Sequence, residues 1–254
     1  MLPEQTDASS AEPVTDVPTG PPQIREPFWG YADVAAVIGL LLLAAVLIGS
    51  VALVSVVFYP ALRNDQTPLL VPTNLALYLA LYLIFWIVLG KRYGKPVFAS
   101  LGWRPTTRAA IAVAVVAAAP LAFLVNGIAV LLHTPKVATP FDNIAQSPLM
   151  LALVGTMAVT IAPLFEELFF RGFLQPLLSR TLGIVAGVLL TAVLFGAVHA
   201  AEYQFVWQYV VAISIVGVVL GVVRVVTNSI IPSTIMHGCY NASFVIALAV
   251  TKRP

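Results

Sequence analysis

The sequence predicts an all-α protein, a polytopic bundle of about seven to eight transmembrane helices. Hydrophobic residues make up 60% of the 254 residues and charged residues only 9%, whereas a soluble domain carries about 25% charged residues. The mean hydropathy is +0.97. Apolar segments of roughly 20 residues, the length needed to cross a bilayer, recur along the chain. These observations exclude a soluble globular protein, and the net charge of +2 is too small to indicate a nucleic-acid partner.

The first 27 residues differ from the rest of the chain. Residues 1–27 contain six prolines and five acidic residues but almost no large apolar side chains. A segment of this composition cannot bury enough apolar surface to fold. We therefore predict a disordered, acidic, proline-rich tail over residues 1–27.

Seven apolar segments follow the tail, and we expect each to form a membrane span. They lie at approximately residues 33–58, 69–89, 109–132, 149–164, 184–199, 205–223 and 230–250. Residues 28–148 are predicted to form the N-terminal transmembrane helices, and residues 149–250 a second part that contains most of the polar motifs.

The distribution of Lys and Arg predicts the orientation in the membrane. Seven spans place the tail, the 90–108 loop, the 165–183 connection and the 224–229 loop on one side. That side carries nine Lys and Arg residues and the other carries four. Cytoplasmic loops carry the excess of Lys and Arg, so the N-terminus is predicted to be cytoplasmic.

The first polar motif is formed by Glu166, Glu167 and Arg171. An ionised group at bilayer depth costs roughly 2.5–3.5 kcal/mol, so such groups usually pair or line a polar site. On a helix Glu167 and Arg171 share a face and can form an ion pair. Glu166 lies about 100° away around the axis, which leaves it available for chemistry. The alternative is an ion pair that only joins helices.

The second motif is His199, four residues after Phe195. A neutral imidazole at this position could accept a proton from water, orient that water or bind a metal. Alternatively, His199 is hydrogen-bonded to a carbonyl near a helix end, with Glu202 as a surface partner.

The third motif is His237 and Asn241, which share a helical face at four-residue spacing. Both side chains can donate hydrogen bonds into the bundle, which suits stabilisation of an oxyanion. Gly238 between them allows close approach of another helix or of a substrate. The alternative is a polar clamp between helices, worth about 1 kcal/mol in a membrane.

Together these motifs resemble the CPBP family of intramembrane proteases, also called the CAAX prenyl protease type II or Abi family. The family pattern is Glu-Glu-x-x-x-Arg, then Phe-x-x-x-His, then His-x-x-x-Asn. The chain has these motifs in this order on three separate hydrophobic segments. The resemblance covers residues 149–250, which would be the protease-like catalytic core. The earlier spans match only in being hydrophobic.

The resemblance implies hydrolysis of a peptide bond inside the bilayer, and we expect the protein to be integral to a bacterial cytoplasmic membrane. Glu166 would activate a water that His199 helps to hold, and His237 with Asn241 would bind the tetrahedral oxyanion. Glu167 and Arg171 would support the shape of the site. The substrate would be a hydrophobic or prenylated peptide or protein, approached among membrane lipids.

The resemblance leaves metal dependence open, because the family has been described both as zinc metalloproteases and as metal-free glutamate proteases. The sequence lacks the His-Glu-x-x-His arrangement that places two zinc ligands on one helix turn. We favour a metal-free water activated by Glu166. If zinc or another divalent metal is used, its expected ligands are Glu166, His199 and His237.

Two other classes of protein are compatible with buried Glu, Arg and His. A proton-coupled transporter also buries such residues, but it would be expected to show broken helices or repeat symmetry. A non-catalytic membrane scaffold or immunity-type protein could retain the fold without activity. The complete set of motif residues favours the protease.

Overall fold

A computed structural model describes residues 27–137, 139 and 144–251, and the described part is helical with no strand. The predicted disordered tail lies outside these residues, apart from Pro27. The elements are α1 (Tyr31–Phe58), α2 (Ala61–Asn64), α3 (Thr67–Phe85), η1 (Trp86–Lys91), α4 (Val97–Ser100), α5 (Arg108–Leu131), α7 (Pro148–Val159), α8 (Ile161–Glu167), η2 (Leu168–Leu174), α9 (Gln175–Leu182), α10 (Ile184–Val198), α11 (Trp207–Thr227) and α12 (Ile230–Thr251).

Six helical stretches in the described part of the chain are long and apolar enough to cross a membrane, and α10 is a shorter apolar helix. The predicted all-α polytopic bundle is therefore confirmed, and the chain is an integral membrane protein. The helix α1 lies beside α3, and its buried residues, Asp33, Val34 and Val37, are all in its first two turns. Most of its remaining length is exposed, as expected for an apolar helix surrounded by lipid.

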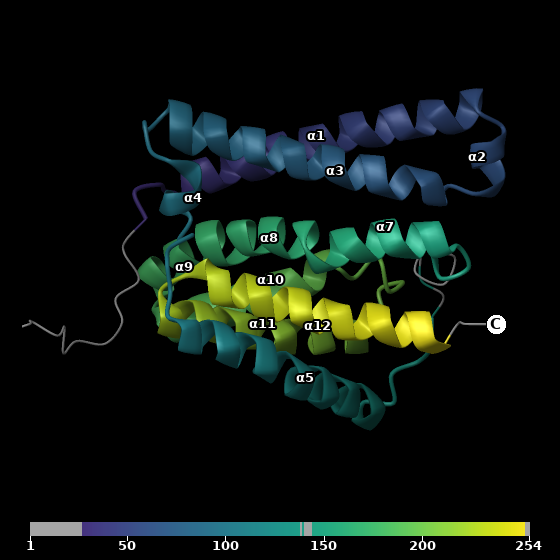
Figure 1. Cartoon of the computed structure of the whole chain (residues 1–254). Coiled ribbons are helices and arrows are strands. Elements are labelled where there is room, and N and C mark those ends of the chain that lie inside the picture. The colour runs from purple at the N-terminus through teal and green to yellow at the C-terminus, as the bar shows by residue number, and fades with distance from the viewer. Residues whose placement is uncertain (1–26, 138, 140–143, 252–254) are drawn as a thin grey trace, which may run out of the picture.

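The helices form layers around the motif-bearing segments. Figure 1 shows α1 and α3 side by side in one layer, α7 and α8 in the next, and α12, α10, α11 and α5 beyond them. Both α3 and α12 contact the α7–α8 segment, and α10 packs closely on α11. The polar motifs on α8, α10 and α12 therefore meet in the interior of the bundle.

One predicted boundary is wrong. We expected a span at 149–164 followed by a connection at 165–183, but residues 148–182 form one apolar helical stretch of 35 residues. The charges do not end this span because Glu167 and Arg171 pair with each other, both fully buried.

The predicted orientation is affected, because Arg171 is an interior residue and so is Arg224, which is buried near the end of α11. Neither counts as a basic residue at the membrane surface, so the predicted orientation depends on fewer charges.

The segment after the two glutamates is a π-helix, η2, whose wider turn changes the backbone hydrogen bonding. Within it, the Phe173 carbonyl accepts a hydrogen bond from the Trp29 indole N–H at 3.1 Å. The Trp29 ring also stacks on the Phe173 ring, with 5.4 Å between centroids. These contacts attach the residues before α1 to the helix that carries Glu166 and Glu167.

The close approach of α12 to α7 depends on Gly238. A Cβ at this position would lie 2.5 Å from the carbonyl oxygen of Val159, and a backbone atom inside a helix cannot easily move away. We expect Gly238→Ala to destabilise the protein by about 1–3 kcal/mol, measured by unfolding in detergent. The matched control is Gly49→Ala, because nothing lies within 4 Å of a Cβ there and Ala favours the helix. Equal stability of the two variants would contradict this account.

Candidate active site

A cavity of about 340 Å³ lies where α3, α7, α8, α10, α11 and α12 meet. Glu166 from α8, His199 at the end of α10, and His237 with Asn241 from α12 all line it. The structure thus brings together the four residues that the sequence analysis proposed for chemistry. Glu167 and Arg171 are not among the lining residues, and lie behind the cavity wall.

Glu167 and Arg171 form the ion pair expected from their four-residue spacing. The Arg171 Nη1 donates to Glu167 Oε1 at 2.8 Å, and its Nη2 donates to the Gly217 carbonyl of α11 at 3.0 Å. The guanidinium also lies over the Phe195 ring, 4.4 Å from the centroid. One side chain therefore connects η2, α11 and α10 directly behind the cavity.

His237 lies between the two adjacent glutamates. Its Nδ1 is 3.3 Å from Glu167 Oε1, and its Nε2 is 3.7 Å from Glu166 Oε2. An ionised carboxylate can only accept, so Nδ1–H donates to Glu167. The side chain of Glu167 is fully buried while that of Glu166 is 24% exposed. The two glutamates thus have different environments, as their angular separation on the helix suggested.

His199 follows the last residue of α10 and lines the cavity. Its Nδ1 lies 2.7 Å from the Phe195 carbonyl oxygen. A carbonyl cannot donate, so Nδ1 carries the proton and the neutral ring retains a lone pair on Nε2. The carbonyl contact that we considered as an alternative role is present, and it leaves one nitrogen available as an acceptor.

Asn241 both lines the cavity and joins two helices. Its Nδ2 donates a hydrogen bond to the Ala158 carbonyl of α7 at 2.8 Å. This is the interhelical clamp considered as an alternative, and it uses one of the two amide N–H groups. The second N–H and the amide oxygen remain for another partner.

Sequence reasoning missed part of the cavity wall. Glu202 was considered only as a surface partner of His199, and that placement is wrong because Glu202 lines the cavity, together with Tyr78, Tyr203 and Tyr240. Burial raises the pKa of the Glu202 carboxyl, His199 opposes this shift, and the charge of Glu166 adds to it. Only the position of Glu202 three residues after His199 could have indicated this, since no motif includes it.

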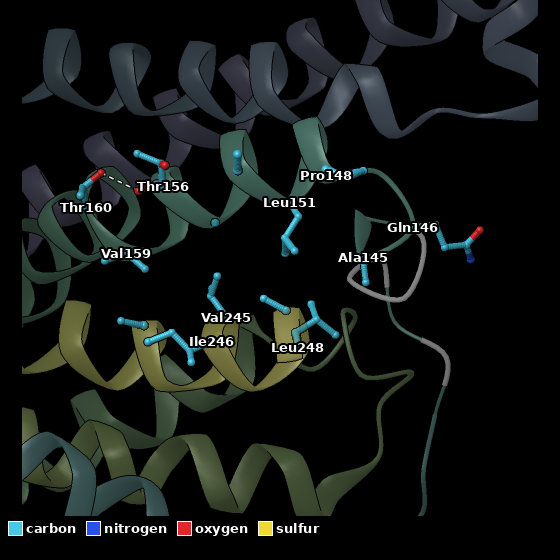
Figure 2. Close-up of a pocket in the computed structure, with 14 residues that line it drawn as sticks. Ala145, Gln146, Pro148, Leu151, Thr156, Val159, Thr160, Val245, Ile246 and Leu248 are labelled. Carbon is cyan, nitrogen blue, oxygen red and sulfur yellow. Dashed lines mark hydrogen bonds between the residues drawn. The ribbon is translucent and has the colours of Figure 1, made fainter. Parts of the chain in front are cut away.

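A second cavity of about 860 Å³ opens between α7 and α12. Figure 2 shows side chains of both helices, including Leu151 and Ile246, on its two sides. No charged residue lines it, and the hydroxyl of Thr160 donates to the Thr156 carbonyl at 2.7 Å. Val245 lines both cavities, so the apolar cavity adjoins the one that contains the glutamates and histidines.

The arrangement of possible metal ligands bears on the metal-dependent alternative. Over the described ranges, no three His, Cys, Asp or Glu side chains gather as a group that could hold a metal ion. In this geometry Glu166, His199 and His237 do not fit the three-ligand site that the alternative requires.

Comparison with known proteins identifies the part of the chain that carries these residues. Residues 148–243 match the family model described as Type II CAAX prenyl endopeptidase Rce1-like. The matched range includes every motif from Glu166 to Asn241. No curated protein and no solved structure matched the chain. Residues 148–243 are therefore similar to the Rce1-like type II CAAX prenyl endopeptidases, which indicates a protease domain within an integral membrane protein.

Proposed function

We propose that this protein is an intramembrane endopeptidase that hydrolyses a peptide bond of a hydrophobic or prenylated, CAAX-type protein or peptide. The observation that supports this most strongly is the single cavity lined by Glu166, His199, His237 and Asn241 from three helices. The match to a CAAX endopeptidase family supports the same class of substrate. The adjoining apolar cavity is compatible with a substrate that carries hydrocarbon.

The first step in this proposal is activation of water. Glu166, partly exposed at the cavity wall, removes one proton from the water as general base. The Nε2 lone pair of His199 accepts a hydrogen bond from the second O–H of the same water and so orients it. The hydroxide oxygen attacks the carbonyl carbon of the scissile bond, and the carbonyl oxygen becomes an oxyanion.

His237 and Asn241 stabilise this oxyanion. With both ring nitrogens protonated, His237 donates Nδ1–H to Glu167 and directs Nε2–H into the cavity, where Asn241 offers its second amide N–H. Positioned donors of this kind are a large contribution to acyl-transfer catalysis. Ionised Glu166, Glu167, Arg171 and His237 carry no net charge together. The proton taken by Glu166 balances the negative charge of the oxyanion, so the site stays neutral.

The second step breaks the peptide bond. The oxyanion reforms its C=O bond as the C–N bond breaks, and the Glu166 carboxylic acid returns its proton to the leaving nitrogen. The products are a carboxylic acid and an amine, and Glu166 is again a carboxylate. Glu167 and Arg171 act in this scheme by holding His237 in position.

The proposal includes a location and an orientation. We place the protein in a bacterial cytoplasmic membrane with its N-terminus and the 90–108 loop on the cytoplasmic side. Lys91, Arg92, Lys95, Arg104 and Arg108 in that loop support this orientation, since basic residues are enriched in cytoplasmic loops.

The test is cleavage of fluorogenic hydrophobic and prenylated CAAX-type peptides by the purified protein in detergent, before and after treatment with a zinc chelator. Because Glu166 and His199 can activate water without a metal, we expect turnover and unchanged rates after chelation. Loss of activity that added zinc restores would instead show a metal site formed by Glu166, His199 and His237. Absence of cleavage in every condition would favour the transporter or scaffold alternatives.

A further inference from the structure

The turn after α10 carries a charged residue, Glu202, directly after a short helix. The helix α10 has 15 residues, which span about 22 Å at 1.5 Å per residue, whereas the hydrocarbon core is about 30 Å thick. It begins next to Arg180 and the start of α1, at one end of the bundle. The turn at residues 199–206 leads into α11, which begins at Trp207 and is itself long enough to cross a membrane, so the turn lies at one end of that span. Irregular backbone there needs water, a polar cavity or protein contacts for its polar groups.

The backbone of this turn is held in a specific conformation. Gln204 and Phe205 have φ values of 54° and 59°, a left-handed conformation that non-glycine residues adopt only when surrounding contacts impose it. The Phe205 N–H donates to the Ala200 carbonyl at 2.8 Å. Tyr203 stacks on Tyr209 with 4.5 Å between centroids. These contacts give Glu202, between His199 and Tyr203, a defined place on the cavity wall.

No lysine or arginine lies beside the carboxylate of Glu202 on the cavity wall, and the basic group that acts on it is the imidazole of His199. None of the residues that line the cavity is a Lys or Arg. The buried guanidinium of Arg171 is committed to Glu167, and His237 faces Glu166 and Glu167. Within the described part of the chain Glu202 makes no ion pair. A carboxylate on the wall of this cavity, with no lysine or arginine beside it, suits a positive charge that arrives with a ligand.

The other side chains near Glu202 are favourable for a cation. Tyr203 from the same turn, Tyr240 from α12 and Tyr78 from α3 line the cavity, and the face of a tyrosine ring attracts ammonium and guanidinium groups. Tyr78 is held by stacking on Phe165, at 5.2 Å between centroids. Burial raises the pKa of the Tyr203 phenol, and the charge of Glu202 adds to the shift, so this ring remains neutral.

From these observations we propose that Glu202 is a specificity-determining residue that receives a cationic side chain of the substrate, Lys or Arg, close to the scissile bond. Tyr203 and Tyr240 flank the bound cation. The inference depends on the proposed peptidase function, because Glu202 lines the same cavity as Glu166 and His199. It adds a charge preference to a substrate that is otherwise selected for its apolar character.

The test compares fluorogenic peptides that differ at one position only, where they carry Lys, norleucine or Glu. Four positions are tested in turn, the two before and the two after the scissile bond. Norleucine retains the aliphatic chain of Lys without its charge. At one position we expect wild type to prefer Lys to norleucine by about tenfold or more in kcat/KM, as for a charge recognised in a partly buried site. Glu202→Gln should abolish this preference, so that the Lys and norleucine peptides have the same kcat/KM, and Glu202→Lys should favour the Glu peptide.

The matched control is Asp65→Asn, an exposed carboxylate at the start of α3 whose Oδ1 accepts from the Thr67 N–H and is retained as an amide oxygen. This variant should keep the wild-type ratio. If wild type shows a Lys-to-norleucine ratio of kcat/KM near one at all four substituted positions, the proposal is overturned. This result needs no variant, so it holds even if a Glu202 variant fails to fold. An equal loss on Lys and norleucine peptides in Glu202→Gln would show a structural role instead. If wild type cleaves none of the peptides, the peptidase function itself fails.

Discussion

Glu166→Gln is expected to lower kcat for peptide cleavage by about 10²–10⁴-fold, the usual contribution of a general base. Glutamine preserves the shape of the side chain and can still hydrogen-bond to water, but it cannot take the proton. The side chain is 24% exposed at the cavity wall, so its replacement should change the melting temperature and KM little. Steady-state kinetics in detergent, with thermal unfolding of the same preparation, measure both quantities.

A second variant at this position separates the proton-transfer role from a charge effect. Glu166→Asp retains a carboxylate but withdraws it by one methylene, so we expect turnover between that of wild type and Glu166→Gln. His133→Ala is the control for general damage, because His133 does not line the cavity. Full turnover by a folded Glu166→Gln protein would remove Glu166 from the mechanism and require another base.

The largest expected effect on stability comes from Arg171→Met. This change removes the guanidinium that pairs with Glu167 at 2.8 Å, where both side chains are fully buried. Breaking a buried ion pair from one side costs about 3–5 kcal/mol, because the remaining charge is left buried without its partner. Methionine approximates the length of the removed chain, so a cavity contributes less. Unfolding in detergent measures the free energy of unfolding.

The double variant Glu167→Gln, Arg171→Met shows whether charge is the cause. It removes both charges, so we expect it to be more stable than Arg171→Met alone, as a double-mutant cycle detects. Arg108→Met, at an exposed arginine in the first turn of α5, is the matched control and should be near neutral. A loss below about 1 kcal/mol in Arg171→Met, the range of a surface pair, would contradict a stabilising role.

Properties that depend on neighbouring residues could be predicted from the sequence, whereas the placement of Glu202 and the contacts of His237 depend on residues far apart in the chain. The sequence alone determined that the chain is a helical membrane bundle, since segment length and hydropathy depend on neighbouring residues. It also indicated the Glu167–Arg171 pair and the separation of Glu166 from Glu167, because both follow from the 3.6-residue helical repeat.

Tertiary structure alone decided which of these groups meet. The contact of His237 with Glu167 joins residues 70 positions apart, and no periodicity within a helix specifies it. The continuous helix at 148–182 was missed because the charges that suggested its end neutralise each other only after folding. Glu202 was considered only as a surface partner of His199, because no sequence motif includes it. Only the short length of α10 and the packing of α3, α8 and α12 around its end place that carboxylate in the cavity.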